Sequence, residues 1–231
     1  MQKLSIIVPA FNEERTIKEV LKILVDLKLY QGIAKEIIIV NDASSDNTKK
    51  IIEDFITNTS EADIQLVHQA VNQGKGAALH LGIKKATGDY IIPQDADLEL
   101  DPADINKLLE KAMDENLDIV YGSRFIEDEA KRNLAWMANH FLTSMTNVLG
   151  KFKLTDMECC YKLIRTSIAQ SLELKEKRFG FEPEITLKLG KVPNVSFGEV
   201  SISYEQRTYE EGKKIGWKDG WHALHCLIKY R

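Results

Sequence analysis

Four carboxylates occupy every second position of one short stretch of the chain. Asp95, Asp97, Glu99 and Asp101 lie in the sequence PQDADLELD (93–101), directly after an apolar run. Carboxylates this close repel one another, so the pattern indicates that a positive partner lies among them. The spacing leaves three interpretations: a calcium ion, a catalytic magnesium or manganese ion, or a solvated acidic turn.

A calcium loop of the EF-hand type does not fit the residues that follow. With Asp95, Asp97 and Glu99 as ligands, the sixth position requires glycine and the twelfth requires glutamate. Those positions hold Leu100 and Asn106. An ion held by one or two carboxylates and completed by substrate phosphates is instead typical of Mg²⁺ or Mn²⁺. The solvated turn stays open as the alternative.

The first 125 residues alternate between strand-like and helix-like segments. Short apolar runs predict strands at 4–8, 36–40, 64–67, 89–93 and 118–121. Amphipathic patterns between these runs predict single helices, one of which we expect to stop at Gly88 and another to start at Asp101–Pro102. Strands separated by single helices imply parallel pairing in a layered α/β fold.

Ligands of an open parallel sheet bind outside the carboxyl ends of its strands. The acidic run follows such an end, and so do Asn12–Glu13, Asp42 and residues 122–124. The sequence contains neither a G-x-x-x-x-G-K-[ST] phosphate loop nor a G-x-G-x-x-G motif after the first strand. We interpret Gly74–Gly76 as the start of a helix, where Gly76 lets one backbone approach another.

The alternation ends near residue 132. A long amphipathic helix is predicted over 134–149, and CYKLIR (160–165), VSFGEVSISYE (195–205) and a final helix from about Trp217 complete the chain. We predict loops around Pro183 and Pro193. Since no linker or repeat is evident, we expect one domain over 1–231.

Composition limits the function classes. Apolar residues make up 44% and charged residues 29%, as in ordinary soluble proteins, and the net charge of −4 argues against general nucleic-acid binding. Three cysteines, two of them adjacent, favour a reduced cytosolic chain. No apolar run is long enough for a signal peptide or a membrane span. His222 and His225 share a helix face in this reading, but no third metal ligand is evident.

Several motifs, taken in their order along the chain, resemble family 2 glycosyltransferases, which are inverting enzymes with the GT-A fold. They are VPAFNEE, NDASSDNT, NQGKGAALHLGI, the Asp-Ala-Asp triplet and GSRF. The later segments TDMECCYKLIRTS, RFGFEPEIT and YEQRTYEEGKKIGWKDG look like the dolichyl-phosphate mannose synthase branch. That branch moves a sugar from a nucleotide sugar to a polyprenyl phosphate.

The resemblance covers essentially the whole chain and implies its architecture. It implies a GT-A nucleotide-diphospho-sugar transferase fold, with a mostly parallel central sheet flanked by helices. Residues 1–125 would form the nucleotide-sugar-binding half, and residues 126–231 the acceptor-side half. The implied cofactor is Mg²⁺ or Mn²⁺, and the implied partners are a nucleotide-diphosphate sugar of the GDP-mannose or UDP-glucose type and a polyprenyl or dolichyl phosphate.

The resemblance also implies roles for single residues. Those expected at the nucleotide sugar are Pro9, Ala10, Asn12, Glu14, Asp42, Lys75, Asp95 and Ala96. Those expected at the metal are Asp95, Asp97 and Glu99. Those expected at the donor and acceptor phosphates are Arg124, Arg132, Arg207, Lys213 and Lys214. Those expected to be catalytic are Asp97, Arg124, Asp156 and Arg207. A metal and arginines at these positions would stabilise the charge of a departing nucleoside diphosphate.

The acceptor decides whether a general base is needed. A polyprenyl phosphate is already an anion, whereas the alternative acceptor, a glycan hydroxyl, has to lose a proton. Asp156, Glu158, Glu182 and Glu184 are candidate bases, and the sequence does not choose among them. Structural roles are also open, such as a turn cap for Asp156 and an ion pair of Glu182 with Arg178.

Two rival functions remain at this point. The cluster of charged residues argues against a non-catalytic nucleotide-sugar-binding protein. A sugar-phosphate nucleotidyltransferase is expected to carry a glycine- and arginine-rich loop after the first strand, where this chain has PAFNEE. Many family members continue into transmembrane helices, and we expect none within residues 1–231. Helices 134–149 and 217–231 are therefore candidates for peripheral membrane contact at the cytoplasmic face, with core or homodimer packing as the alternative.

Overall fold

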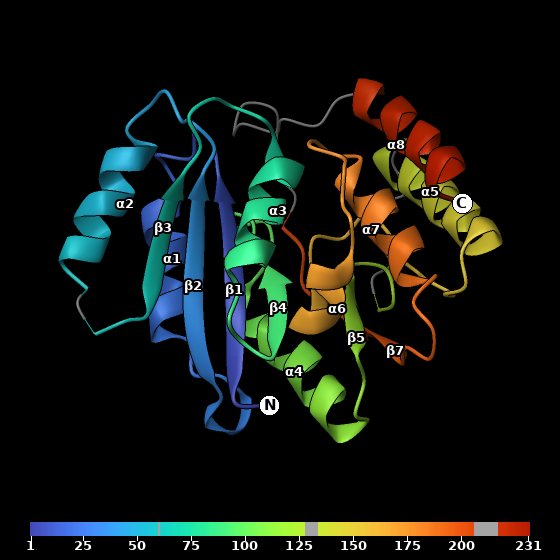
Figure 1. Ribbon diagram of the computed structural model, residues 1–231, viewed down its shortest axis with the longest axis horizontal. Coiled ribbons are helices and arrows are strands. Elements are labelled where there is room, and N and C mark those ends of the chain that lie inside the picture. Colours follow the sequence, from blue (N-terminus) through green and yellow to red (C-terminus); the bar gives the residue numbers. More distant parts are fainter. Residues whose placement is uncertain (60, 128–133, 206–216) are drawn as a thin grey trace.

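The computed structural model describes residues 1–59, 61–127, 134–205 and 217–231, without the side chains of 134, 135 and 217–219. Within these residues one sheet of seven strands forms the centre of the molecule, in the order β3-β2-β1-β4-β6-β5-β7 (Figure 1). The strands are β1 (Lys3–Ala10), β2 (Ala34–Asn41), β3 (Ile64–His68), β4 (Tyr90–Pro93), β5 (Ile119–Ser123), β6 (Lys162–Arg165) and β7 (Phe197–Ser201).

Helices connect the strands. They are α1 (Ile17–Asp26), α2 (Thr48–Thr57), α3 (Lys75–Lys85), α4 (Ile105–Asp114), α5 (Leu134–Leu149), α6 (Thr166–Ser171), α7 (Phe181–Leu189) and α8 (Trp217–Tyr230), with short 3₁₀ turns η1 (Tyr30–Gly32) and η2 (Pro102–Asp104). The five strands and the helices predicted for the first 125 residues are all present. Their apolar patterns are local, and such patterns determine which segments become elements.

The sheet is mostly parallel, as the sequence predicted. β1, β2, β3 and β4 pair in parallel, and β5 pairs in parallel with β7. β6 is the exception, because it lies between β4 and β5 and runs antiparallel to both. The carboxyl ends of β1, β2, β4 and β5 therefore meet at one edge, where ligands of such sheets bind.

Both faces of the sheet are covered. Leu4, Ile6 and Val8 of β1 pack into the core that holds α1, α2 and α4, whereas Ile7 points into the core that holds α3, α6, α7 and α8. Successive side chains of a strand point to opposite faces, so a strand buried on both faces is apolar throughout. In Figure 1, α5, α7 and α8 gather at one end of the molecule, beside β5 and β7.

Two local expectations were wrong. Helix α3 ends at Lys85 rather than at Gly88, and Gly88 instead lies where a Cβ would be 2.8 Å from the Lys3 carbonyl oxygen. The segment around Pro183 is not a loop but the first turn of α7. Proline is tolerated there because first-turn amides have no helical acceptor. Asp101 does start its helix, since its carboxylate accepts a hydrogen bond from the Ala103 amide.

Glu36 joins three strands at the edge opposite the carboxyl ends. Its buried carboxylate accepts hydrogen bonds from the Ser5 hydroxyl at 2.5 Å and from the Thr87 amide at 2.7 Å, and forms an ion pair with Lys3 at 2.9 Å. Burial alone raises the pKa of Glu36, but these donors outweigh it and lower the pKa to about 2. The ionised form is therefore preferred in the folded protein.

We expect Glu36→Gln to lower the free energy of unfolding at pH 7 by about 1–3 kcal/mol, because it leaves buried donors poorly paired. A lowered pKa stabilises the fold above the ordinary value of 4.5, and this stabilisation is lost as the pH falls toward about 2. In urea denaturation, the difference in the free energy of unfolding between wild type and variant should therefore shrink as the pH falls over that range. Glu110→Gln, at an exposed glutamate, is the control. A difference in the free energy of unfolding that does not change with pH would contradict a stabilising role of the ionised Glu36 carboxylate.

Candidate active site

The loops after β1 and β2 are tied together at the carboxyl edge of the sheet. The Asn12 side chain accepts a hydrogen bond from the Ser45 amide at 2.8 Å, and the Glu14 carboxylate accepts one from the Asn47 amide at 3.0 Å. Asn12 has a φ of 53°, in the left-handed region that asparagine tolerates better than most residues. Both residues thus fix the shape of the donor-side edge.

Asp42, at the end of β2, organises the loop before α3. Its buried carboxylate accepts hydrogen bonds from the Gln73 amide at 2.8 Å, the Gly74 amide at 2.7 Å and the Asn72 side chain at 3.0 Å. These contacts give Asp42 a positioning role. Its predicted contact with a base or ribose stays a prediction.

Lys75 crosses from the start of α3 to the acidic run. Its ammonium group lies 2.6 Å and 2.9 Å from the two carboxylate oxygens of Asp95. Although burial alone would lower the pKa of Lys75, Asp95 raises it well above its ordinary value, so the lysine stays charged. Lys75 is one positive partner that the alternating carboxylates require.

Two glycines allow this crossing. A Cβ on Gly74 would lie 2.6 Å from the Lys177 carbonyl oxygen, and one on Gly76 would overlap the Glu176 carbonyl oxygen. Gly74 also has a φ of 101°, which favours glycine. The expectation that Gly76 lets one backbone approach another is confirmed, and the approaching backbone is the segment before α7.

The acidic run forms a compact turn. The Thr16 hydroxyl donates to the Ala96 carbonyl oxygen at 2.6 Å, the Glu99 amide donates to Asp97 at 3.1 Å, and Leu98 has a φ of 63°. The Tyr204 hydroxyl donates to Glu99 at 3.2 Å. An oxygen-only set of carboxylates suits Mg²⁺ or Mn²⁺. Asp95, whose two oxygens both contact Lys75, and Asp97 and Glu99 are the carboxylates of this turn that could hold such an ion.

Arg124, directly after β5, forms a two-pronged ion pair with Asp156. Its Nε lies 2.6 Å and its Nη2 2.8 Å from the two carboxylate oxygens, and the guanidinium carbon lies 5.0 Å from the centre of the Tyr204 ring. The Asp156 side chain is fully buried. The pair, together with a contact between Arg124 and the Tyr204 side chain, holds the guanidinium in a fixed orientation.

The segment 156–162 contacts residues that directly follow both β4 and β5. Asp156 contacts Arg124, the Tyr161 hydroxyl donates to the Gln94 side chain, and the buried Lys162 pairs with Glu182. Burial and the Asp95 charge raise the pKa of the Cys160 thiol well above its ordinary value, which puts this segment near the acidic run. Gln94, Tyr161 and Tyr204 were missed from the sequence, since no local pattern marks them.

Three of the four candidate bases are already engaged. Asp156 holds Arg124 rather than a turn, Glu182 pairs with Lys162 rather than Arg178, and Glu184 binds Lys188 and the amides of the segment before α7. Glu158 differs. Its buried Oε1 has no hydrogen-bond partner among the described residues, and burial together with Glu182 raises its pKa to about 7.

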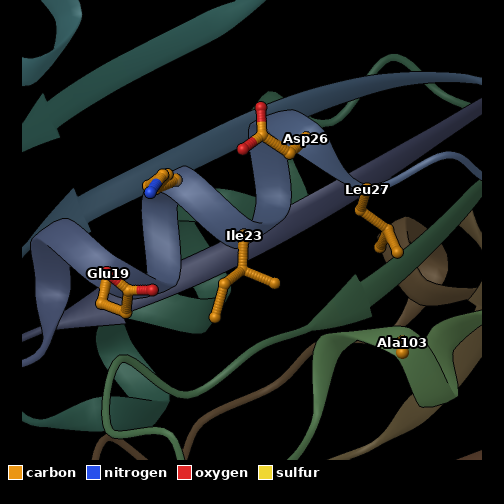
Figure 2. A pocket seen from close by; sticks show the side chains of 6 residues that line it. Glu19, Ile23, Asp26, Leu27 and Ala103 are labelled. Atoms are coloured by element: carbon orange, nitrogen blue, oxygen red, sulfur yellow. The ribbon is translucent and has the colours of Figure 1, made fainter.

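Some predicted site residues do not enter this geometry. Arg132, Arg207, Lys213 and Lys214 lie outside the described residues. The chain reaches that gap beside the acidic run, because the Glu205 amide donates to the Glu99 carbonyl oxygen at 2.9 Å. Pro9 and Ala10 end β1 next to β2. An open hollow between α1 and η2 (Figure 2) is lined by Glu19, Lys22, Ile23, Asp26, Leu27 and Ala103, and contains none of the predicted site residues.

Comparisons with known proteins identify the family and the fold. The sequence model of "Glycosyl transferase family 2" matches residues 5–172. An uncharacterized protein of Methanocaldococcus jannaschii is 33% identical, with 90% of this chain and 93% of that protein covered. A dolichyl-phosphate beta-glucosyltransferase of Dictyostelium discoideum is 30% identical over 92% of this chain, and a dodecaprenyl-phosphate galacturonate synthase of Rhizobium johnstonii is 28% identical over 91%.

The chain spans only part of those two named relatives, 68% of the first and 61% of the second. Among solved structures, glucosyl-3-phosphoglycerate synthase from Mycobacterium tuberculosis, in complex with Mn²⁺, UDP and phosphoglyceric acid, superimposes with a TM-score of 0.69. It is 18% identical, and the match covers 99% of this chain and 78% of that one. The fold is therefore the GT-A fold of nucleotide-sugar enzymes, and the chain belongs to glycosyl transferase family 2.

Proposed function

We propose that this glycosyltransferase moves a hexose from a nucleotide-diphosphate sugar to a polyprenyl phosphate, with inversion and with Mg²⁺ or Mn²⁺. The observation that carries the proposal is the meeting of two fixed charge pairs at one edge of the sheet. Lys75–Asp95 lies on the donor side and Arg124–Asp156 on the acceptor side, with Asp97 and Glu99 in the same acidic turn as Asp95.

On the donor side, the loops held by Asn12, Glu14 and Asp42 form the wall against which the nucleotide binds. Asp97 and Glu99 would hold the metal, which would supply charge neutralisation at the departing diphosphate. Between turnovers, Lys75 orients the Asp95 carboxylate and balances its negative charge. Fixed groups of this kind lower the barrier because they need no reorientation as charge develops.

On the acceptor side, Arg124 brings a guanidinium group to the phosphate. Asp156 and the Tyr204 ring fix that group, and a planar guanidinium matches phosphate oxygens in pairs. A phosphate acceptor brings its own negative charge, so it attacks without a base. The engagement of Asp156, Glu182 and Glu184 in ion pairs fits a reaction of that kind.

The names of the relatives support the same acceptor class. The Dictyostelium and Trichomonas vaginalis relatives are named for dolichyl phosphate, and the Rhizobium relative for dodecaprenyl phosphate. Dolichyl and dodecaprenyl phosphates are long isoprenoid lipids, which place the acceptor at a membrane surface. No described helix is long and apolar enough to cross a bilayer.

Two neighbouring helices offer a surface for that membrane. α5 exposes Met137, Phe141 and Val148, and α8 exposes Trp221 and Ile228, each set at helical spacing. The two helices lie side by side at one end of the molecule (Figure 1). Exposed Lys151, Lys153 and Arg231 are near the ends of these helices in sequence. Apolar side chains with basic neighbours favour an anionic lipid interface.

A hydroxyl acceptor is the second candidate, and Glu158 is the observation that favours it. Its carboxyl group has a pKa of about 7, and its buried Oε1 has no hydrogen-bond partner within the part of the chain that the structure describes, which is the protonation behaviour of a general base at neutral pH.

We expect Asp97→Asn to weaken Mn²⁺-dependent donor binding by about 100-fold or more, since a metal bridge to a diphosphate is worth several kcal/mol. Calorimetric titration with UDP-glucose and GDP-mannose, with and without Mn²⁺, measures this and identifies the base. Asp101→Asn is the matched control, because Asp101 belongs to the same run but caps η2. Equal effects of both substitutions, or none, would reject the metal site.

Glu158→Gln separates the two acceptors. With polyprenyl phosphate, we expect kcat to stay within about tenfold of wild type and its pH profile to keep its shape, because no base acts. Loss of a true base lowers kcat by about 10²–10⁴-fold and removes the rise in rate through about pH 7. Rates at pH 5.5–8.5 with polyprenyl phosphate and with a glycan acceptor provide the comparison. A loss of that size with the lipid acceptor would overturn the base-free mechanism.

We expect Phe141→Ser and Trp221→Ser each to reduce co-sedimentation with vesicles of anionic phospholipid several-fold, because these side chains are 55% and 67% exposed. Val71→Ser, at a 63% exposed apolar residue in another part of the chain, should leave vesicle binding unchanged. If Phe141→Ser and Trp221→Ser instead altered the molecular mass in solution and left vesicle binding intact, the two helices would be a homodimer surface.

A further inference from the structure

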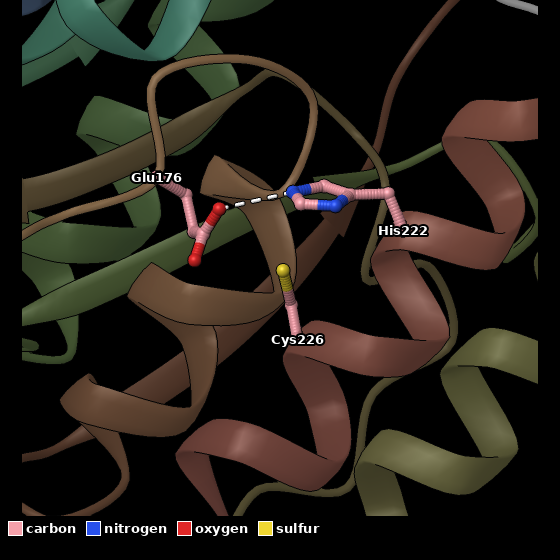
Figure 3. A group of neighbouring side chains, drawn as sticks. All are labelled: Glu176, His222 and Cys226. Carbon is pink, nitrogen blue, oxygen red and sulfur yellow. Dashed lines mark hydrogen bonds and ion pairs between the residues drawn. The ribbon is translucent and has the colours of Figure 1, made fainter.

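We propose that Glu176, His222 and Cys226 form a second metal site, one that takes a zinc-type ion and is separate from the acidic run. The proposal does not depend on the proposed glycosyl transfer. The site lies where the segment before α7 meets α8 (Figure 3). The same segment contacts Gly74 and Gly76 elsewhere along its backbone.

The three side chains converge from two elements. His222 and Cys226 are four residues apart on α8 and therefore share one face of the helix, and Glu176 faces them from the segment before α7. Their ligand atoms all lie within 4.8 Å of one another, and His222 Nε2 is 2.9 Å from Glu176 Oε2. A tetrahedral zinc ion with bonds of about 2.0–2.3 Å separates its ligand atoms by about 3.3–3.8 Å. Small rotations of these side chains suffice.

The Glu176 carboxylate is already oriented as metal-binding carboxylates are. Its Oε1 accepts hydrogen bonds from the Tyr230 hydroxyl at 2.7 Å and from Lys229 at 2.7 Å, which leaves Oε2 directed toward His222. Outer donors of this kind fix the ligating oxygen and tune its basicity. The site thus has an outer layer of contacts as well as three ligands.

The space around the ligands depends on a glycine. A Cβ at Gly180 would lie 2.7 Å from Cys226 Sγ and 2.8 Å from His222 Nε2, so any other residue would crowd both ligand atoms. Cys226 and Glu176 are buried, whereas His222 is exposed and leaves a solvent-side position open for a fourth ligand such as water. A thiolate with an imidazole selects zinc over the hard ions that the acidic run suits.

The alternative is a hydrogen-bonded latch that holds α8 without an ion. Without an ion the thiol is protonated, because burial and the Glu176 carboxylate raise the pKa of Cys226 to about 12, and a metal has to displace that proton. The two readings differ at Lys229. In a latch, Lys229→Met removes a stabilising ion pair and nothing else. In a metal site, it also removes a donor that orients the ligating Glu176, and metal binding weakens.

The test is a Zn²⁺ titration of the full chain after treatment with a chelator, against a chromophoric zinc competitor and without nucleotide sugar. We expect one equivalent to bind with a dissociation constant of about 1 µM or lower. His222→Ala and Cys226→Ala should each weaken binding by about tenfold or more, and Lys229→Met should weaken it as well. His225→Ala, at an exposed histidine on the same helix, and Asp97→Asn should leave zinc binding unchanged.

A thermal melt gives the second readout. Zn²⁺ should raise the Tm of the wild type but not that of His222→Ala, whose exposed side chain can be removed without loss of the fold. Circular dichroism checks the folding of Cys226→Ala. The proposal is overturned if the wild type binds no zinc in this range, if His222→Ala binds as the wild type does, or if His222→Ala and His225→Ala lose affinity equally.

Discussion

The crowding of negative charge after β4 is the constraint on which the site depends. Carboxylates at alternate positions are compatible with a stable edge only when cations are held against them. Lys75 meets this requirement from α3, and it reaches Asp95 because Gly74 and Gly76 bring the start of that helix against the segment before α7. Asp42 in turn holds the loop that delivers the lysine. A change in any of these contacts alters the charge balance at the site.

The sequence predicted the elements of the first 125 residues well, because each is encoded by its own apolar pattern and by nearby start signals such as Asp101. It did not predict that β6 enters the sheet antiparallel between β4 and β5, or that Pro183 begins a helix. Pairing between strands depends on contacts across 40 residues or more, which no local pattern contains. A proline within a short polar segment is compatible with a loop and with a first helical turn alike.

In the site, too, the sequence predicted some features and not others. Topology alone brought Asn12, Asp42, Asp95 and Arg124 to one edge, since parallel strands end together. The sequence could not predict which side chains pair with the buried carboxylates. Lys162 is 20 residues from its partner Glu182, and His222 is 46 residues from its partner Glu176. Burial makes such pairings obligatory, but it does not say which cation meets which carboxylate.

The backbone contact at Gly74 and Gly76 has a consequence for the evolution of the chain. The segment before α7 touches the donor-side loop with one side and α8 with the other, and the Ala77 amide donates to the Lys177 carbonyl oxygen at 3.0 Å. The C-terminal half is therefore not an exchangeable module. A chimera that takes residues 126–231 from a relative keeps the loop before α3 in place only if the incoming segment lies as close to the α-carbons of Gly74 and Gly76 as this one does.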